Sequence, residues 1–120
     1  MTVYCIQEPR GTADGVPKYD VLEASSYGKV KFLFSEFAQL MKSSGAAINS
    51  LRKKLKGFND GDYLIAAGDP GLIAISCLVA SDLNFGRVKL LKWDRRDRKY
   101  YSLSIDLYNK EKESDEWNRL

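Results

Sequence analysis

The side chains that most often perform catalysis are sparse in this sequence. It contains no histidine, which removes the usual general base near neutral pH and every catalytic pair of serine or cysteine with histidine. Its two cysteines, Cys5 and Cys77, are too few for a cysteine-rich zinc site, and we interpret both as free, buried thiols in a reducing compartment. We therefore expect no metal, no cofactor and no enzymatic activity.

Two pairs of carboxylates have a spacing that could serve chemistry, Asp60 with Asp62 and Asp94 with Asp97. Acids in such an arrangement can hold Mg²⁺ for reactions of phosphates. The first pair flanks the glycine of the segment NDGD, which is explained more simply as a turn before a strand. No other motif supports a Mg²⁺ site, so we prefer the structural interpretation.

The segment AAGDPGLIA, residues 66–74, is a candidate ligand-binding turn. In open α/β sheets, ligands bind beyond the carboxyl ends of strands, where the next helix begins. A small ligand or nucleotide would then meet Gly68, Asp69, Pro70 and Gly71, with Asp69 on a hydroxyl or amine. Alternatively, Asp69 is only the N-cap and Pro70 the first residue of the helix. A similar GDPG turn occurs in the tetrapyrrole methylases, but that resemblance covers four residues.

The segment KWDRRDRKYY, residues 92–101, is the candidate partner-binding surface. Basic and aromatic side chains alternate with acids in it, and those we assign to the surface are Lys92, Trp93, Arg95, Arg96, Arg98, Lys99 and Tyr100. Arginine beside aromatic rings suits single-stranded nucleic acid, and it also suits a protein partner. The same residues could simply keep the edge of a sheet soluble.

A second basic face is predicted on the helix that contains LRKKLKGF, residues 51–58. Apolar residues repeat there at helical spacing, and the cations lie away from that stripe, at Arg52, Lys53, Lys54 and Lys56. The net charge is only +3 and the pI about 8.8, below the value of about 9 typical of a dedicated nucleic-acid domain. The charge therefore favours a protein partner over nucleic acid.

The hydrophobic pattern predicts the elements that carry these residues. Strands are expected at 2–7, 28–35, 62–68, 87–94 and 99–108, and helices at 47–58 and 70–86, with 36–47 ambiguous. Residues 62–93 then form a parallel βαβ crossover, and the last two strands form a β-hairpin. The expected fold is α/β, with a small mixed five-stranded sheet and helices packed against it.

The length and composition predict one domain. A chain of 120 residues with 44% hydrophobic residues can bury a core without metal or disulfides. We place the α/β domain at residues 1–108 and a polar, charged tail at 109–120. No apolar run approaches the roughly 18 residues of a membrane span, and the opening segment lacks a signal peptide. These features predict a cytoplasmic protein.

Several segments resemble a family of small uncharacterised proteins of tailed bacteriophages. They are VYCIQEPRG, YDVLEASSYGKVKFLF, LRKKLKGFNDGDYLIAAGDPGLIAI and GRVKLLKWDRRDRKYYSLSIDLY, within residues 3–108. The resemblance implies a phage gene product in the cytoplasm of the bacterial host, and it carries no known activity or site residues.

The preferred function is a non-enzymatic phage accessory protein that binds a macromolecular partner, most simply a protein, through residues 92–101. Two alternatives stay open: a small-ligand or nucleotide-binding domain that uses Gly68–Gly71, and a nucleic-acid-binding protein that uses the basic hairpin. Self-association through the strand 99–108 is a further expectation, whereas a membrane partner is not expected.

Overall fold

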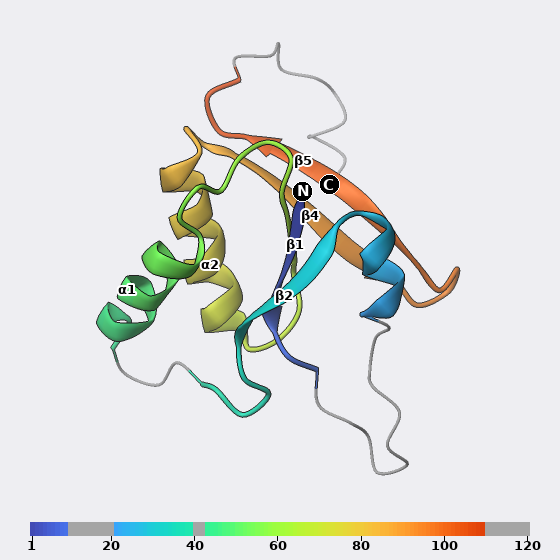
Figure 1. Cartoon of the computed structure of the whole chain (residues 1–120), viewed down its shortest axis with the longest axis horizontal. Helices are drawn as coiled ribbons and strands as arrows, with labels where there is room; N and C mark the ends of the chain where they lie inside the picture. The colour runs from blue at the N-terminus through green and yellow to red at the C-terminus, as the bar shows by residue number, and fades with distance from the viewer. Residues whose placement is uncertain (10–20, 40–42, 110–120) are drawn as a thin grey trace, which may run out of the picture.

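The computed structural model describes residues 1–9, 21–39 and 43–109 (Figure 1). Within these ranges the chain forms five strands, a short 3₁₀ helix (η1) and two α-helices. In chain order these are β1 (Thr2–Gln7), η1 (Leu22–Ser26), β2 (Lys29–Phe34), α1 (Gly45–Lys54), β3 (Tyr63–Ile65), α2 (Pro70–Leu83), β4 (Arg87–Asp94) and β5 (Lys99–Asp106).

The strands form one mixed sheet in the order β2-β1-β3-β4-β5. β1 is parallel to both β2 and β3, and β3 is parallel to β4. β5 is antiparallel to β4, with Lys92 opposite Tyr101 and Asp94 opposite Lys99. The predicted α/β class, the parallel crossover from β3 to β4 and the C-terminal hairpin are confirmed.

The two faces of the sheet are covered differently. α1 and α2 lie side by side on one face (Figure 1). There Leu51 and Leu55 pack with Leu72 of α2 and with apolar side chains of the sheet such as Leu64 of β3. η1 lies against the other face, and its Ala24 joins a second buried cluster that contains Val3, Cys5, Ile65, Leu91 and Tyr100. Side chains of β1 alternate between the two clusters, as the period of a strand requires.

Some boundaries differ from the sequence expectation. α1 begins at Gly45 and ends at Lys54, and β3 spans only Tyr63–Ile65. The predicted 62–68 run continues past β3 into the turn before α2. Of the ambiguous segment 36–47, residues 36–39 are non-helical and residues 45–47 belong to α1, while residues 40–42 lie outside the described residues. Of the predicted tail, residues 110–120 also lie outside the described residues.

Two further features bear on the sequence analysis. Both cysteines are free, with Cys5 buried and Cys77 half-buried in α2. Among the residues that the structure describes, no helix has the length and apolar character needed to cross a membrane.

Candidate functional site

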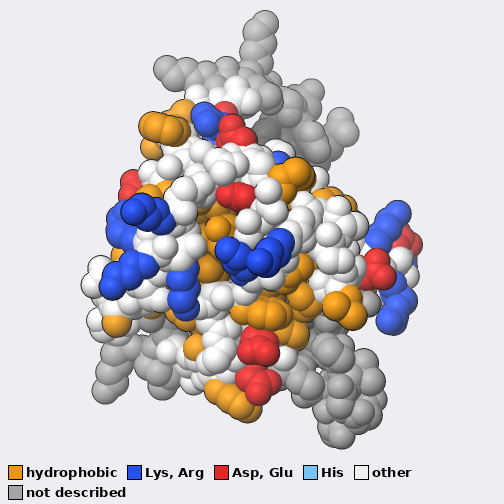
Figure 2. All heavy atoms as spheres, viewed as in Figure 1, with side chains coloured by type: hydrophobic (Ala, Val, Ile, Leu, Met, Phe, Trp, Pro, Cys, Tyr) orange, Lys and Arg blue, Asp and Glu red, His pale blue; other side chains and the backbone are white. Residues whose placement is uncertain are grey.

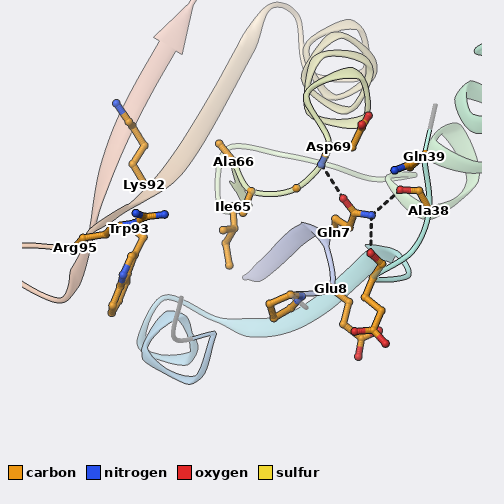
Figure 3. A pocket seen from close by; sticks show the side chains of 14 residues that line it. Gln7, Glu8, Ala38, Gln39, Ile65, Ala66, Asp69, Lys92, Trp93 and Arg95 are labelled. Atoms are coloured by element: carbon orange, nitrogen blue, oxygen red, sulfur yellow. Dashed lines mark hydrogen bonds between the residues drawn. The ribbon is translucent and has the colours of Figure 1, made fainter. Parts of the chain in front are cut away.

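An open pocket of about 550 Å³ lies where the parallel strands end (Figure 3). β1, β3 and β4 each contribute their carboxyl end and the residues that follow, and the segment after β2 closes one side. The lining residues from these four segments are Gln7, Glu8 and Pro9; Ile65 to Asp69; Lys92, Trp93 and Arg95; and Glu36, Ala38 and Gln39. We call this the carboxyl-edge pocket.

The order of the strands explains why the pocket forms here. From β1 the chain moves outward to β2, and from β2 it returns past β1 to β3 on the other side. The connections after β1 and β3 therefore leave toward opposite faces, one carrying η1 and the other leading to α2. In a parallel sheet, such a reversal leaves a crevice at the carboxyl ends of the strands, and ligands of open α/β proteins bind in it.

Gln7, the last residue of β1, holds the walls of the pocket together. Its side-chain Nε2 donates to the backbone oxygens of Ser35, Glu36 and Ala38 at 3.0, 3.3 and 2.7 Å. Its Oε1 accepts the backbone N–H of Asp69 at 2.7 Å. The side chain is 5% exposed, so these bonds form away from bulk water. One amide therefore fixes the segments after β1, β2 and β3 relative to one another (Figure 3).

Gly68 lies against the side chain of Gln7, and this contact leaves no room for a Cβ. Its φ of +121° is a conformation that L side chains rarely adopt, and a Cβ at this position would lie 2.5 Å from the Cβ of Gln7 and 2.6 Å from its Oε1. Both the backbone and the close approach require glycine here. Packing against Gln7 therefore accounts for this glycine, which the sequence alone suggested as part of a ligand turn.

Asp69 is the N-cap of α2, as the sequence analysis proposed in its structural interpretation. Its Oδ2 accepts the backbone N–H of Leu72 at 3.1 Å, and Pro70 is the first helical residue. Helix N-termini bind phosphate through free backbone N–H groups. Here the N–H groups of Asp69 and Leu72 are engaged, and Pro70 has none. Pro70 and Gly71 do not line the carboxyl-edge pocket, which is lined by Gly68 and Asp69.

The hairpin brings part of the predicted basic surface to the same pocket. Lys92, Trp93 and Arg95 line it on the β4 side. The Trp93 ring packs edge-on against Tyr100, with centroids 4.9 Å apart and an interplanar angle of 62°. The Oδ1 of Asp94 accepts the backbone N–H groups of the two residues at the tip, at 2.9 and 3.2 Å. The turn is therefore rigidified by Asp94, and its cations extend outward (Figure 2).

The structure corrects the assignment of Tyr100 to the exposed binding surface. Tyr100 is only 5% exposed and belongs to the buried cluster beneath η1. Because successive residues of a strand face opposite ways, the neighbouring Tyr101 lies on the helix-covered face, where Lys92 Nζ sits 5.6 Å from its ring. Trp93 and Tyr101 therefore lie on opposite faces of the hairpin, and these rings form no continuous platform for stacked bases.

The second basic face is separate from the pocket, and part of it serves the fold. Arg52 pairs with Asp82 of α2 at 3.1 Å. The ammonium of Lys54 donates to the backbone oxygen of Leu33 and lies 5.3 Å from the Phe34 ring. The other two cations, Lys53 and Lys56, are exposed. Figure 2 shows the cations of α1 and those of the hairpin tip on opposite sides of the view.

The carboxylate pairs support the turn interpretation. Asp62 is buried and accepts the backbone N–H groups of Thr2 and Asn59 at 2.9 and 3.1 Å. Asp60 accepts hydrogen bonds from the Arg87 guanidinium at 3.0 Å and from Asn84, and these bonds lower the pKa of its carboxyl. In the part of the chain that the structure describes, no three histidine, cysteine or acidic side chains are grouped so as to hold a metal ion.

Sequence reasoning missed the most connected residue of the site. Gln7 bonds to residues 28 to 62 positions away, which no local pattern reveals. Its one signal was a polar residue at the end of an otherwise apolar strand. Glu8 and Glu36, which also line the pocket, were likewise not singled out.

Comparison with known proteins identifies a family. A model described as Phage Pam3 gp32-like protein matches residues 1–107, close to the whole domain expected from the sequence. No curated protein and no solved structure matches the chain.

Proposed function

Because this chain belongs to the phage Pam3 gp32-like family, we propose that it is a non-enzymatic phage accessory protein that binds a protein partner in the infected bacterium. Its binding surface is the carboxyl-edge pocket together with the hairpin tip. A segment of the partner enters the pocket, and the flanking residues of the partner contact the arginines of the tip.

The observation that carries this proposal is the convergence of two separately predicted sites. Lys92, Trp93 and Arg95 of the hairpin line the same hollow as Gly68 and Asp69 of the strand-to-helix turn. Tryptophan and arginine are the residues over-represented at the energetic centres of protein interfaces. A half-buried indole and an exposed guanidinium at the mouth of one pocket are therefore suited to anchoring a protein segment.

The electrostatics of the pocket favour a protein over a nucleotide or nucleic acid. Phosphate groups need free backbone N–H groups or clustered cations. At the start of α2 the N–H groups of Asp69 and Leu72 are engaged by Gln7 and by the Asp69 carboxylate, and Pro70 has none, which leaves only the N–H of Gly71. Glu8, which lies across the pocket from Arg95 (Figure 3), and Glu36 add carboxylates to the lining that repel phosphate. A protein segment can carry acidic and basic side chains together, so it can pair with Arg95 and with the carboxylates of the same pocket.

The floor of the pocket sets what the partner must present. Ile65, Ala66 and Ala67 form a surface of short or apolar side chains beside the indole of Trp93. An apolar side chain of the partner fits against this floor, and an acidic residue beside it pairs with Arg95. We therefore propose a partner segment in which an apolar residue is adjacent to an acidic one.

A small ligand is the second candidate, and the position of the pocket favours it. The reversal point between β1 and β3 is where open α/β sheets bind ligands, and about 550 Å³ lies within the usual range for such sites. The Asp69 carboxylate and the single N–H left at the start of α2, that of Gly71, disfavour a phosphate there, so the ligand of this alternative is an apolar or aromatic molecule without a phosphate. A thermal shift with such compounds in the absence of protein partners would favour this alternative.

The test is an affinity pull-down from lysate of infected bacteria after nuclease treatment, with two charge-matched variants. Arg95→Glu reverses the charge at the pocket, whereas Lys53→Glu makes the same change on the exposed face of α1. We expect one protein to be retained by the wild type and by Lys53→Glu and to be lost from Arg95→Glu. A purified complex of that protein with the chain should then weaken at least tenfold on Arg95→Glu.

Three outcomes would contradict the proposal. Bound material that disappears with nuclease would indicate nucleic acid. Equal loss from both variants would indicate a general effect of charge. Retention of nothing by the wild type would leave the small-ligand alternative.

A further inference from the structure

The two edges of the sheet differ in how they are protected from pairing with other strands. Edge strands are usually blunted by charged side chains, especially lysine. The edge strand β2 carries exposed Lys29 and Lys31, and on either side of Lys31 lie Val30 and Phe32, the latter 44% exposed. The opposite edge, β5, instead exposes Tyr101 and Leu103, at 46% and 44%. At one end of this eight-residue edge the backbone oxygen of Tyr100 accepts a hydrogen bond from the hydroxyl of Tyr27 at 3.2 Å, whereas the side chains at the centre of β5 do not oppose pairing.

The register with β4 defines which backbone groups of β5 point outward. The N–H of Leu107 donates to the oxygen of Gly86 at 3.0 Å, and the ladder from Arg87 opposite Asp106 continues this register. In an antiparallel pair, hydrogen-bonded positions alternate with positions whose groups face the other way. The odd-numbered residues of β5 thus bond to β4, and the backbone groups of Ser102 and Ser104 point away from the sheet.

We propose that β5 pairs antiparallel with β5 of a second copy of this chain, about a two-fold axis at Leu103. In this register Ser102 meets Ser104 of the second copy, so the outward backbone groups of the two strands form hydrogen-bonded pairs. Leu103 meets its own counterpart, and Tyr101 meets Ile105. The two sheets join into one continuous sheet across the axis.

The side chains of β5 favour a second copy over another strand. A two-fold axis perpendicular to the sheet keeps each face on the same side, so the apolar Tyr101, Leu103 and Ile105 of both copies share one face. Cross-strand pairs of aromatic and branched apolar residues stabilise sheets. The register also avoids like charges in opposition, because Lys99 faces Leu107.

This pairing is independent of the proposed function. Antiparallel strands place the two hairpin tips at opposite ends of the joined sheet. The carboxyl-edge pocket of each copy lies near its own tip and stays open. A dimer of this kind would present two such pockets facing away from each other.

The experiment measures the mass of the full chain in solution and then the register. Light scattering should show about twice the chain mass of 13.6 kDa at high concentration. Residues opposite each other at a non-hydrogen-bonded position have Cα atoms about 4.5 Å apart, within reach of a disulfide. Leu103→Cys should therefore cross-link two chains on mild oxidation, whereas Ser102→Cys and the unmodified chain should not.

A measurement on the unmodified protein guards against variants that fail to fold. The amide hydrogens of Ser102 and Ser104 should exchange more slowly as the protein concentration rises, by at least tenfold, while the amide of Leu103, bonded to β4, changes little. A monomer at high concentration would overturn the proposal, as would concentration-independent exchange at the two serines. Cross-linking of Ser102→Cys in place of Leu103→Cys would overturn the register.

Discussion

Replacing Gln7 with alanine tests whether one side chain holds the carboxyl-edge pocket together. The Nε2 of Gln7 has two hydrogens and contacts three backbone oxygens, so we count two hydrogen bonds, and its Oε1 accepts a third. A neutral hydrogen bond contributes a net of about 1 kcal/mol, which gives about 3 kcal/mol for the set. Ser35 is exposed and its oxygen can bond to water instead, so we expect a loss of about 2–3 kcal/mol.

The assay is urea unfolding of Gln7→Ala beside Gln39→Ala, which removes the same type of side chain from the exposed wall of the same pocket. Surface substitutions without such bonds change the free energy of unfolding by less than about 0.5 kcal/mol. We therefore expect the free energy of unfolding of Gln7→Ala to lie about 2 kcal/mol or more below that of Gln39→Ala. If the free energy of unfolding of Gln7→Ala matched that of Gln39→Ala, the amide of Gln7 would not be holding the three segments together.

Three further predictions concern neighbouring features. Gly68→Ala should lower the free energy of unfolding by about 3 kcal/mol or more in urea, because it combines a strained φ with a clash against Gln7; a change below about 1 kcal/mol would refute this. Asp69→Asn should leave stability within about 0.5 kcal/mol, since asparagine caps helices as well as aspartate, whereas Asp69→Ala should cost about 1 kcal/mol by thermal unfolding. Burial raises the pKa of the Cys77 thiol, so at pH 8 this thiol should react with a disulfide reagent more slowly than free cysteine does. Its reaction rate should rise as the pH is raised further, and a rate equal to that of free cysteine at pH 8 would contradict the burial.

The elements that could be predicted from the sequence are those with strong local signals. Asp69 and Pro70 mark the start of α2, and the turn between two alternating runs marks the hairpin. Both depend on interactions within a few residues, which a linear pattern records. The α/β class followed from the order of these elements.

The remaining features depend on contacts between distant segments. The hydrogen bonds of Gln7 to Ser35 and to Asp69 exist only because β1 lies between β2 and β3, and the linear sequence does not give this order. The burial of Tyr100 depends on the packing of η1 against the sheet, and η1 itself lacks a side-chain cap. The turn before α2 and the hairpin also line one pocket only because the strand order places β3 beside β4.

The bonding of Gln7 also has a kinetic consequence. Segments that are already fixed before a partner arrives lose little further freedom on binding, so the encounter does not wait for the pocket to assemble. Variants that remove an uncharged contact at the rim should then change mainly the lifetime of the complex, since affinity differences within one rigid interface appear chiefly in the dissociation rate. Arg95→Glu should in addition slow association, because it reverses a charge that steers the encounter. Loosening the pocket at Gln7 should also slow association, because only a fraction of the molecules would be ready to bind.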